Sequence, residues 1–189
     1  MYHIGKDVRK KKSADLIAEG LRRIMRSGST DKLTIASVCQ EAGVSRATFY
    51  RLFDSVDDVM RYLCDGEFDM IFQAYQKERE QGIDGTPVQV YSRFLLKEEG
   101  GLIAVLRHKK TTLLVESHIR MLKRYAPVFF PQMDPSSDEF VYFIQTRSWM
   151  LVGVLSAWLE TDRRANAEEV DRWLSEQMKF LYRGPGSST

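Results

Sequence analysis

The stretch from Thr34 to Phe53, TIASVCQEAGVSRATFYRLF, indicates the fold and anchors the interpretation of the rest of the chain. Thr34 and Ser45 each precede a short segment with helical spacing, where a hydroxyl side chain satisfies unpaired N–H groups. Gly43 lies between the two segments, where a tight turn requires a positive φ. The first segment has an apolar side made of Ile35, Val38, Cys39 and Ala42. This arrangement predicts a helix-turn-helix, in which two short helices cross steeply.

The second of these helices has two different faces. Val44, Phe49 and Phe53 share the side that can pack on the preceding helix, and the remaining residues face outward: Arg46, Ala47, Thr48, Tyr50 and Arg51. Arginine can pair bidentately with guanine, and a tyrosine hydroxyl commonly anchors a phosphate. An ordinary helical hairpin with a solvated polar face would show the same division into an apolar and a polar side. The caps, the turn and the outward side chains together favour DNA binding.

A known family shows the same run of residues. The pattern T-I-A-x-x-C-x-x-A-G-V-S-x-x-T-x-Y-x-x-F, followed by an acidic helix start at Ser55, resembles the DNA-binding domain of TetR-family transcriptional regulators. The resemblance covers roughly the first third of the chain and implies a helical DNA-binding protein whose last two helices form a dimer bundle. Two positions depart from the pattern. Val56 stands where a lysine is usual, and Leu52 stands where histidine or an aromatic residue is common. Because both family residues contact the DNA backbone, part of the usual phosphate clamp is left without a counterpart.

The composition fits a folded helical protein. Of 189 residues, 43% are hydrophobic and 29% are charged, which allows a packed core and argues against disorder. Helical spacing dominates, so we expect an all-α fold. Residues 1–53 carry 11 Lys and Arg against 5 Asp and Glu, a net +6, which leaves −4 on the remainder because the total is +2. A basic end joined to a mildly acidic body is typical of a protein whose one end meets a polyanion.

Other classes of site have little support in the sequence. Cys39 and Cys64 give no disulfide framework, and Cys39 falls on an apolar helix face where a structural thiol is expected. The three histidines lack metal-ligand spacing, so we expect no metal and no cofactor. The amino-terminal end lacks an apolar signal segment, and the most apolar run, 149–159, is too short to span a bilayer. We therefore expect a cytoplasmic protein that is not an enzyme and has no membrane partner.

The chain divides into two expected domains. Residues 1–54 form the DNA-binding domain, and residues 55–183 form a larger helical domain for ligand binding and dimerisation, followed by a disordered tail at 184–189. A helix over 55–80, with Ser55 as its cap, links the two domains. The first helix should run from about Asp15 to Ser27–Gly28, with an apolar stripe of Leu16, Ile17, Leu21, Ile24 and Met25.

Further helices follow from periodicity and from capping residues. We expect helices over about 86–100, 102–106 and 111–125, the last of which should end before Pro127 and Pro131. A long helix over 140–160, capped by Ser136, is apolar on nearly all sides between residues 149 and 159. Such a helix should be buried on every side, partly by a second subunit. Asn166 begins the final helix.

Three sets of candidate site residues result. The DNA contacts are Lys11, Lys12, Thr34, Ser45, Arg46, Ala47, Thr48, Tyr50 and Arg51; the two lysines belong to a basic cluster that is either an arm or helix start reaching phosphates or a frayed, solvated end. The ligand-pocket candidates, all expected to face inward, are Phe72, Tyr75, Tyr91, Phe94, Leu114, His118, Met121, Tyr142 and Trp149, although such residues more often simply fill a core. The dimer-interface candidates are Trp149, Val152, Gly153, Ser156, Trp173 and Met178.

These features predict a homodimeric transcriptional regulator that binds double-stranded DNA at a roughly palindromic operator. Family frequency favours a repressor, released when a small-molecule effector binds the larger domain. The alternative is a DNA-bound architectural or protein-interaction factor of the same fold that has no effector. An effector must bind one conformational state preferentially, so thermal-shift screening separates the two hypotheses.

Overall fold

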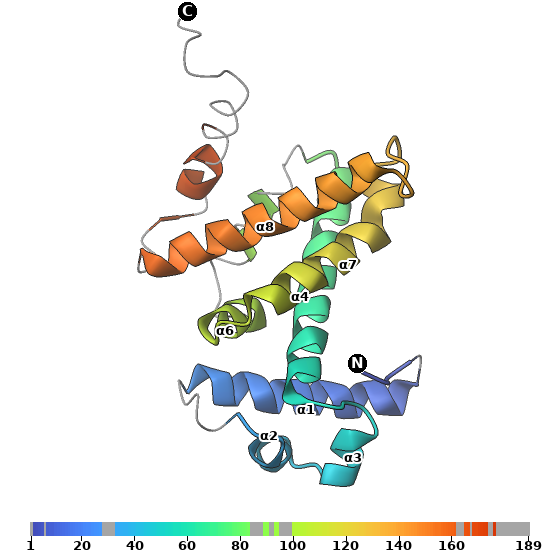
Figure 1. The fold of residues 1–189 in the computed structure, drawn as a ribbon, viewed down its shortest axis with the longest axis vertical. Coiled ribbons are helices and arrows are strands. Elements are labelled where there is room, and N and C mark those ends of the chain that lie inside the picture. The colour runs from blue at the N-terminus through green and yellow to red at the C-terminus, as the bar shows by residue number, and fades with distance from the viewer. Residues whose placement is uncertain are drawn as a thin grey trace, which may run out of the picture.

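A computed structural model describes residues 2–5, 7–27, 33–83, 89–90, 93–94, 100–161, 165–166, 168–173 and 176. Within these residues the regular structure is helical, apart from one isolated antiparallel bridge between Tyr2 and Phe53, which confirms the expected all-α fold. The labelled helices are α1 (Val8–Arg26), α2 (Ile35–Ala42), α3 (Arg46–Tyr50), α4 (Val56–Glu80), α6 (Gly101–Arg107), α7 (Thr111–Phe129) and α8 (Asp138–Glu160). Helices α1, α2 and α3 lie at the lower end of Figure 1, α4 rises from them, and α7 and α8 lie towards the other end.

The helix-turn-helix forms as its capping residues predict. The Thr34 hydroxyl accepts a hydrogen bond from the Ser37 N–H at the start of α2, and the Ser45 hydroxyl accepts one from the Thr48 N–H at the start of α3. Gly43 ends α2 in the left-handed conformation, with φ of 65°. Apolar side chains from all parts of the amino-terminal unit (residues 2–54) are fully buried: Ile17, Leu21, Val38, Phe49, Leu52 and Phe53.

Helix α1 differs from its prediction at its start and on one face. It begins at Val8 and not near Asp15, because the Asp7 carboxylate accepts hydrogen bonds from the N–H groups of Arg9 (2.8 Å) and Lys10 (3.3 Å). Leu16 is 56% exposed, so its assignment to the apolar stripe was wrong. The small residues Ala14, Ala18 and Gly20 are buried on this face of α1 instead. A Cβ on Gly20 would lie 2.9 Å from the Ala42 nitrogen, so glycine there allows α1 and α2 to approach closely.

Residues 2–4 form part of the amino-terminal unit, which the sequence did not indicate. The His3 N–H donates to the Leu52 carbonyl at 2.8 Å, and Ile4 is buried. The Tyr2 ring packs edge-on against Tyr62 of α4, with ring centroids 5.5 Å apart. This segment therefore covers the connection between α3 and α4.

Helix α4 spans the 25 residues expected for the link, but α7 runs further than predicted. Pro127 lies inside α7, which continues to Phe129. Proline removes only one helical N–H donor, and near a helix end the cost is small compared with the burial of an aromatic ring. Phe129 is 9% exposed, and its ring lies 5.0 Å from Tyr75 and 5.6 Å from Phe72. Tertiary packing thus extends the helix past the proline.

Helix α8 is buried on one side only. Its cap is Ser137, one residue later than predicted, with the hydroxyl 3.1 Å from the Phe140 N–H. One face packs inward through Phe140, Ile144, Ser148, Val152, Leu155 and Trp158. On the opposite face Tyr142 is 75% exposed and Trp149 is 53% exposed. Beyond α8, Asn166 begins a helix as expected, since its side chain accepts from the Glu169 N–H and its own N–H donates to the Glu169 carboxylate, both at 2.9 Å.

Candidate nucleic-acid interface and its connection to the helical core

The outward residues of α3 form an exposed surface on a rigid base. Phe49 is completely buried, while Arg46, Ala47, Tyr50 and Arg51 are exposed. The Tyr50 ring stands edge-on to Phe49, with centroids 5.8 Å apart, and remains 56% exposed. The buried ring therefore fixes α3, and two arginines and a phenol project from it. These side chains can donate hydrogen bonds to base edges and to phosphates.

The hydroxyl groups among the predicted DNA contacts already have structural partners. Ser45 Oγ lies 3.1 Å from Thr48 Oγ1 in addition to its bond with the Thr48 N–H. Thr34 Oγ1 lies 3.1 Å from Ser37 Oγ, which in turn accepts from the Thr34 N–H. These pairs close the first turns of α2 and α3. Thr34, Ser45 and Thr48 therefore act first as structural residues of the helix-turn-helix.

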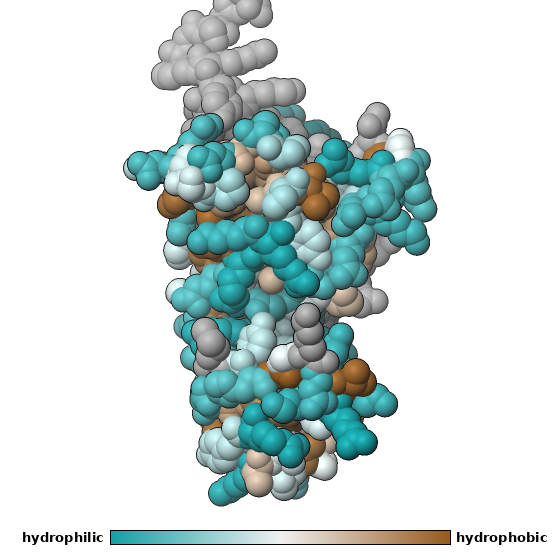
Figure 2. Space-filling view, turned by 90° about the vertical axis from the view of Figure 1, so that its right-hand side faces the viewer, coloured by the Kyte–Doolittle hydropathy of each residue, from teal (hydrophilic) through white to brown (hydrophobic). Residues whose placement is uncertain are grey.

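Lys11 and Lys12 are exposed residues of α1, which agrees with the expected helix start and not with an extended arm. Helices α1 and α3 are in contact, and both lie at the lower end of the molecule in Figure 1. The predicted lysines and the predicted α3 residues thus come from neighbouring elements of one unit. Figure 2 shows that hydrophilic residues dominate the face seen from the right of Figure 1, with hydrophobic residues scattered between them.

The two positions that depart from the TetR pattern present no polar side chain. Leu52 is completely buried, and Val56, the first residue of α4, is half-buried against the core. Beside them, Ser55 caps α4 by accepting from the Asp58 N–H at 3.2 Å. A phosphate contact at this corner would have to come from other residues.

A ladder of ion pairs joins α4 to the segment that contains α7. The residues on α4 recur every four positions, which places them on one side of the helix. Asp57 pairs with Lys110 (3.0 Å), Arg61 with Glu116 (3.5 Å), Asp65 with Arg120 (2.8 Å) and Asp69 with Arg124 (3.2 Å). The four pairs, here called the α4–α7 ladder, hold the register of the helix that leaves the amino-terminal unit.

Asp65 extends this ladder to the amino-terminal segment. It is 7% exposed, and it accepts hydrogen bonds from the Tyr2 hydroxyl (2.7 Å) and from the Arg120 guanidinium (2.8 Å). Burial raises the pKa of Tyr2, and the hydrogen bond to Asp65 raises it further, so the phenol stays protonated as a donor. One carboxylate therefore connects the amino-terminal segment, α4 and α7.

The pocket candidates separate into a buried group and an exposed group. Phe72, Leu114, His118 and Met121 are buried, and Tyr75 is half-buried. Tyr142 is 75% exposed and Trp149 is 53% exposed, so the expectation that these two face inward was wrong, whereas Phe94, at 44% exposed, lines the pocket between α1, α4 and α6. The buried face of α8 contains Phe140, Ile144 and Ser148, which lie on one side of the helix. Tyr142 and Trp149 lie on the opposite side and therefore point away from the core. Tyr91 lies outside the described residues.

The buried candidates belong to a packed aromatic cluster. The Phe72 ring stacks on Tyr125 with centroids 4.9 Å apart, and the His118 ring lies 5.0 Å from Phe68. His118 Nδ1 is 2.9 Å from the Ser148 hydroxyl of α8. Burial lowers the pKa of His118 to about 3, so the ring is neutral at pH 7. A neutral, hydrogen-bonded core histidine fits this environment.

The dimer-interface candidates also differ in orientation. Trp149 and Trp173 are exposed, Gly153 is exposed with no atom of the described residues within 4 Å of an added Cβ, and Ser156 is half-buried. Val152 is 2% exposed and faces the core of its own subunit, so its placement on an outer face was wrong. Its position on α8 is in phase with Ser148 and Leu155. Met178 lies outside the described residues.

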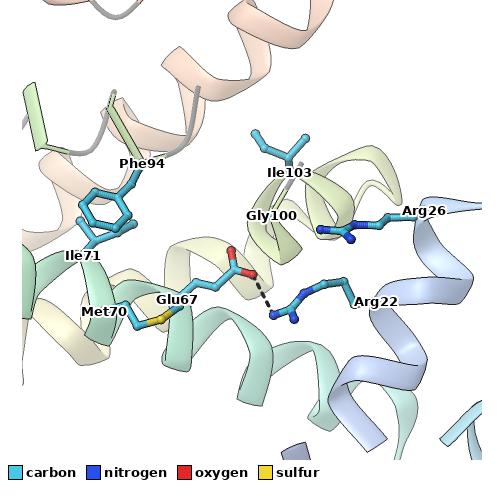
Figure 3. A pocket seen from close by; sticks show the side chains of 8 residues that line it. All are labelled: Arg22, Arg26, Glu67, Met70, Ile71, Phe94, Gly100 and Ile103. Carbon is cyan, nitrogen blue, oxygen red and sulfur yellow. Dashed lines mark hydrogen bonds and ion pairs between the residues drawn. The ribbon is translucent and has the colours of Figure 1, made fainter. Parts of the chain in front are cut away.

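A pocket lies between α1, α4 and α6, and Phe94 is the predicted pocket candidate that lines it. It has a volume of about 200 Å³ and is lined by Arg22, Arg26, Glu67, Met70, Ile71, Phe94, Gly100 and Ile103 (Figure 3). Glu67 accepts hydrogen bonds from the N–H groups of Gly101 (2.5 Å) and Leu102 (3.0 Å) and from the Arg22 guanidinium (3.2 Å). A Cβ at Gly100 or Gly101 would lie within 2.8 Å of the Glu67 carboxylate. In the sequence, the adjacent glycines Gly100 and Gly101 were the feature that could have indicated the close approach of Glu67.

No described helix is long and apolar enough to cross a membrane. The described residues contain no group of three or more His, Cys, Asp and Glu side chains that could hold a metal ion.

Solved structures share this fold. The chain is similar to Lin0861 from Listeria innocua, with a TM-score of 0.73 and 17% sequence identity over 95% of this chain and 96% of that one. It is also similar to the fatty acid degradation regulator FadR from Bacillus halodurans, with a TM-score of 0.51 and 17% identity over 84% of this chain and 90% of that one. These likenesses show the fold alone, a helical fold of the kind seen in a transcription regulator. Neither protein-family models nor curated protein sequences gave a match.

Proposed function

We propose that this protein is a TetR-like transcriptional regulator that binds double-stranded DNA as a homodimer and represses transcription until a small-molecule effector binds. The observation that carries the proposal is the α3 surface, where Arg46, Tyr50 and Arg51 are exposed directly beside the buried Phe49. A short helix after a tight turn, with basic and phenolic groups outward, suits entry into a major groove. Residues 1–53 carry a net charge of +6, which supports the assignment of this end of the molecule to DNA binding.

The homodimer rests on the outer face of α8. Trp149 is 53% exposed, Tyr142 is 75% exposed, and among the described residues none comes within 4 Å of a Cβ added at Gly153. Clustered large apolar side chains on one helix face are uncommon on monomers and common at interfaces. A two-fold dimer would present two copies of α3 and would require a roughly palindromic operator.

Regulation rests on α4. This helix starts beside α3 and continues along α7, to which the α4–α7 ladder ties it. A ligand that prefers one arrangement of these helices would shift the spacing between the two copies of α3. The similarity to a fatty acid degradation regulator supports a ligand-responsive regulator as the general class. The protein acts in this proposal by binding and not by catalysis.

One observation favours the alternative of a DNA-bound architectural or protein-interaction factor without an effector. Phe72 and Tyr125 are stacked with centroids 4.9 Å apart in the region where a ligand pocket was expected. Stacked rings fill space that an enclosed ligand would need. Saturable stabilisation of the protein by any small molecule in a thermal-shift screen would decide against this alternative.

The test is selection of DNA from a random-sequence library, followed by binding measurements on the selected site. We expect a palindromic site whose affinity falls by roughly 10³–10⁵ between 50 and 200 mM salt, if the dimer contacts about 6–10 phosphates. Replacing Arg46 with alanine should cost about 1–3 kcal/mol and relax the preference at one base pair in each half-site. Arg9→Ala, on exposed α1, is the matched control and should leave the base preference unchanged. Failure to select any site would reject the proposal.

A further inference from the structure

Residues 2–4, here called the strap, contact two different parts of the molecule. At the connection between α3 and α4 (residues 51–55), the His3 N–H donates to the Leu52 carbonyl at 2.8 Å. Further along α4, Asp65 accepts a hydrogen bond from the Tyr2 hydroxyl at 2.7 Å. We propose that the strap transmits the position of α7 to the connection that follows α3, and that Tyr2 is the positioning residue in this link.

The strap is held firmly at the connection. Tyr2 forms an antiparallel bridge with Phe53, and Ile4 is buried at 6% exposed. His3 Nε2 also lies 3.0 Å from the Asp54 carboxylate, but both side chains are exposed, so this pair adds little stability. The backbone hydrogen bond and the buried Ile4 therefore make the strap and the connection move together.

The Tyr2 ring fills the space between the connection and α4. Its centroid lies 6.5 Å from that of Phe53 and 5.5 Å from that of Tyr62, a residue of α4. The Tyr62 hydroxyl in turn donates to Asp15 of α1 at 2.5 Å. This packing fixes the Tyr2 ring and directs its hydroxyl group towards Asp65.

Asp65 is shared between the strap and α7. Its Oδ2 accepts from the Tyr2 hydroxyl and from Arg120 Nε (3.3 Å), and its Oδ1 accepts from Arg120 Nη2 (2.8 Å). A carboxylate that is 7% exposed stays ionised chiefly because of a charged partner, and a hydrogen bond to an ionised acceptor is stronger than one to a neutral acceptor. Arg120 thus keeps Asp65 ionised, and the ionised Asp65 holds Tyr2. Displacement of Arg120 would loosen the strap.

The strap gives α7 a second route to α3. The first route runs back along α4 from Asp65 to Val56, whereas the strap links Asp65 to Leu52 through the consecutive residues Tyr2 and His3. A shift of α7 can therefore reach the connection without bending α4. Its effect on DNA binding rests on the function proposed above, but the coupling within the chain does not.

The test measures hydrogen exchange at the His3 amide in the full chain without DNA, relative to an unstructured peptide of the same sequence. Tyr2→Phe should lower the protection of this amide by about ten-fold or more. Arg120→Gln, although it changes α7, should lower it by at least about three-fold, and Arg120→Lys, which keeps the charge, should preserve most of it. Arg124→Gln is the matched control one turn along α7, where Arg124 pairs with Asp69, and should change the protection by less than about two-fold.

A double variant separates coupling from two independent structural contacts. Because Tyr2 and Arg120 act through the same carboxylate, adding Arg120→Gln to Tyr2→Phe should lower the protection by less than about two-fold more. Multiplication of the two effects, or unchanged protection in Arg120→Gln alone, would overturn the inference. A melting temperature close to that of the original protein shows that each variant is folded.

DNA binding by folded Tyr2→Phe measures the positioning role. A connection that is less firmly held leaves a smaller fraction of molecules with α3 in the binding arrangement, so the affinity for the selected site should fall by at least about three-fold. The loss should be equal at single-base-pair variants of the site, because Tyr2 reads no base. Unchanged affinity would overturn the positioning role. Coupled exchange in a protein that selects no DNA would reject only the proposed function.

Discussion

The amino-terminal unit and the α4–α7 junction are stabilised in different ways. In the unit, fully buried apolar side chains such as Phe49 and Val38 hold α2 and α3, and hydroxyl caps close their first turns. At the junction, α4 meets α7 through apolar residues and also through the four ion pairs of the α4–α7 ladder. Asp65 is the buried member of the ladder, at 7% exposed, whereas Lys110 and Arg124 at its ends are 42% and 64% exposed, so the end pairs contribute little to stability. Apolar packing and caps therefore hold α3 in the unit, and apolar packing together with one buried ion pair holds α4 against α7.

The largest expected effect comes from removing the buried ring of α3. Phe49→Ala should lower the free energy of unfolding by about 3–5 kcal/mol, since it removes a completely buried aromatic side chain and leaves a cavity. The neighbouring Tyr50→Ala is the matched control, because Tyr50 is 56% exposed on the same short helix and should cost less than about 1 kcal/mol. Denaturant unfolding measures both. Equal losses would show that α3 is not held by its buried face.

The next effect should arise where the ladder is buried. Asp65→Asn should cost about 1.5–3 kcal/mol, because the carboxylate is 7% exposed and accepts charged and phenolic hydrogen bonds from Arg120 and Tyr2. Asp69→Asn is the control one turn along the ladder. Its side chain is 27% exposed and accepts from Arg124, which is 64% exposed, and from the Tyr125 hydroxyl at 2.6 Å, so the expected loss is smaller than for the buried Asp65. Unfolding at fixed salt checks the difference. A greater loss for Asp69→Asn would place the main connection elsewhere on the ladder.

A pH-dependent effect should come from the interior beside the junction. The pKa of His118 is lowered to about 3 in the folded chain, against about 6.5 when unfolded. The folded state therefore favours the neutral ring, and this contribution is complete above pH 6.5 and is lost as the pH falls towards 3. At pH 5 the loss should be roughly 2 kcal/mol.

His118→Gln provides the comparison for this prediction. The difference in unfolding free energy between the original protein and the variant should shrink by about 2 kcal/mol from pH 7 to pH 5. The lowered pKa of His108 acts in the same direction in both proteins and cancels. Parallel pH profiles would mean that His118 takes up a proton in the folded chain, and the interior would then adjust more easily than its packing indicates.

The two regions also differ in how much the sequence reveals. Thr34, Gly43 and Ser45 encode the helix-turn-helix because caps and a left-handed turn depend on neighbours within a few residues. The burial of Phe49 and Phe53 follows from the same local periodicity. The basic charge of the first 53 residues is likewise visible without a structure. The exposure of Arg46, Tyr50 and Arg51 was therefore predictable, while their contact with DNA stays a prediction.

The helical core was less predictable because distant residues determine it. Nothing near Pro127 indicates that Phe72 and Tyr75 will hold the last turn of α7. The apolar sequence of α8 does not show which side of the helix packs against the rest of its own subunit. For this reason the prediction that Tyr142 and Trp149 face inward was wrong. Glu67 gains its role only when α1 and α6 approach it. Such contacts depend on tertiary packing, which periodicity along one helix does not specify.

The smallest expected effect separates the structural role of a cap from contact with DNA. Ser45 lies at the start of α3, where its hydroxyl accepts from the Thr48 N–H at 3.1 Å. Ser45→Ala should lower the unfolding free energy by about 1 kcal/mol through loss of this cap. Ser45→Asp keeps an acceptor at the same place, and a negative charge near a helix start is favourable, so its stability should stay within a few tenths of a kcal/mol of the original. The same charge would face the DNA phosphates if α3 enters a groove, and binding to the selected site should then fall at least about ten-fold.

Circular dichroism melting and binding at fixed salt give the two measurements independently. Loss of both stability and binding in Ser45→Asp would show that the cap tolerates no substitution. A stable Ser45→Asp variant with unchanged DNA affinity would instead place the start of α3 away from the phosphates, and the rigid unit would have to present another surface.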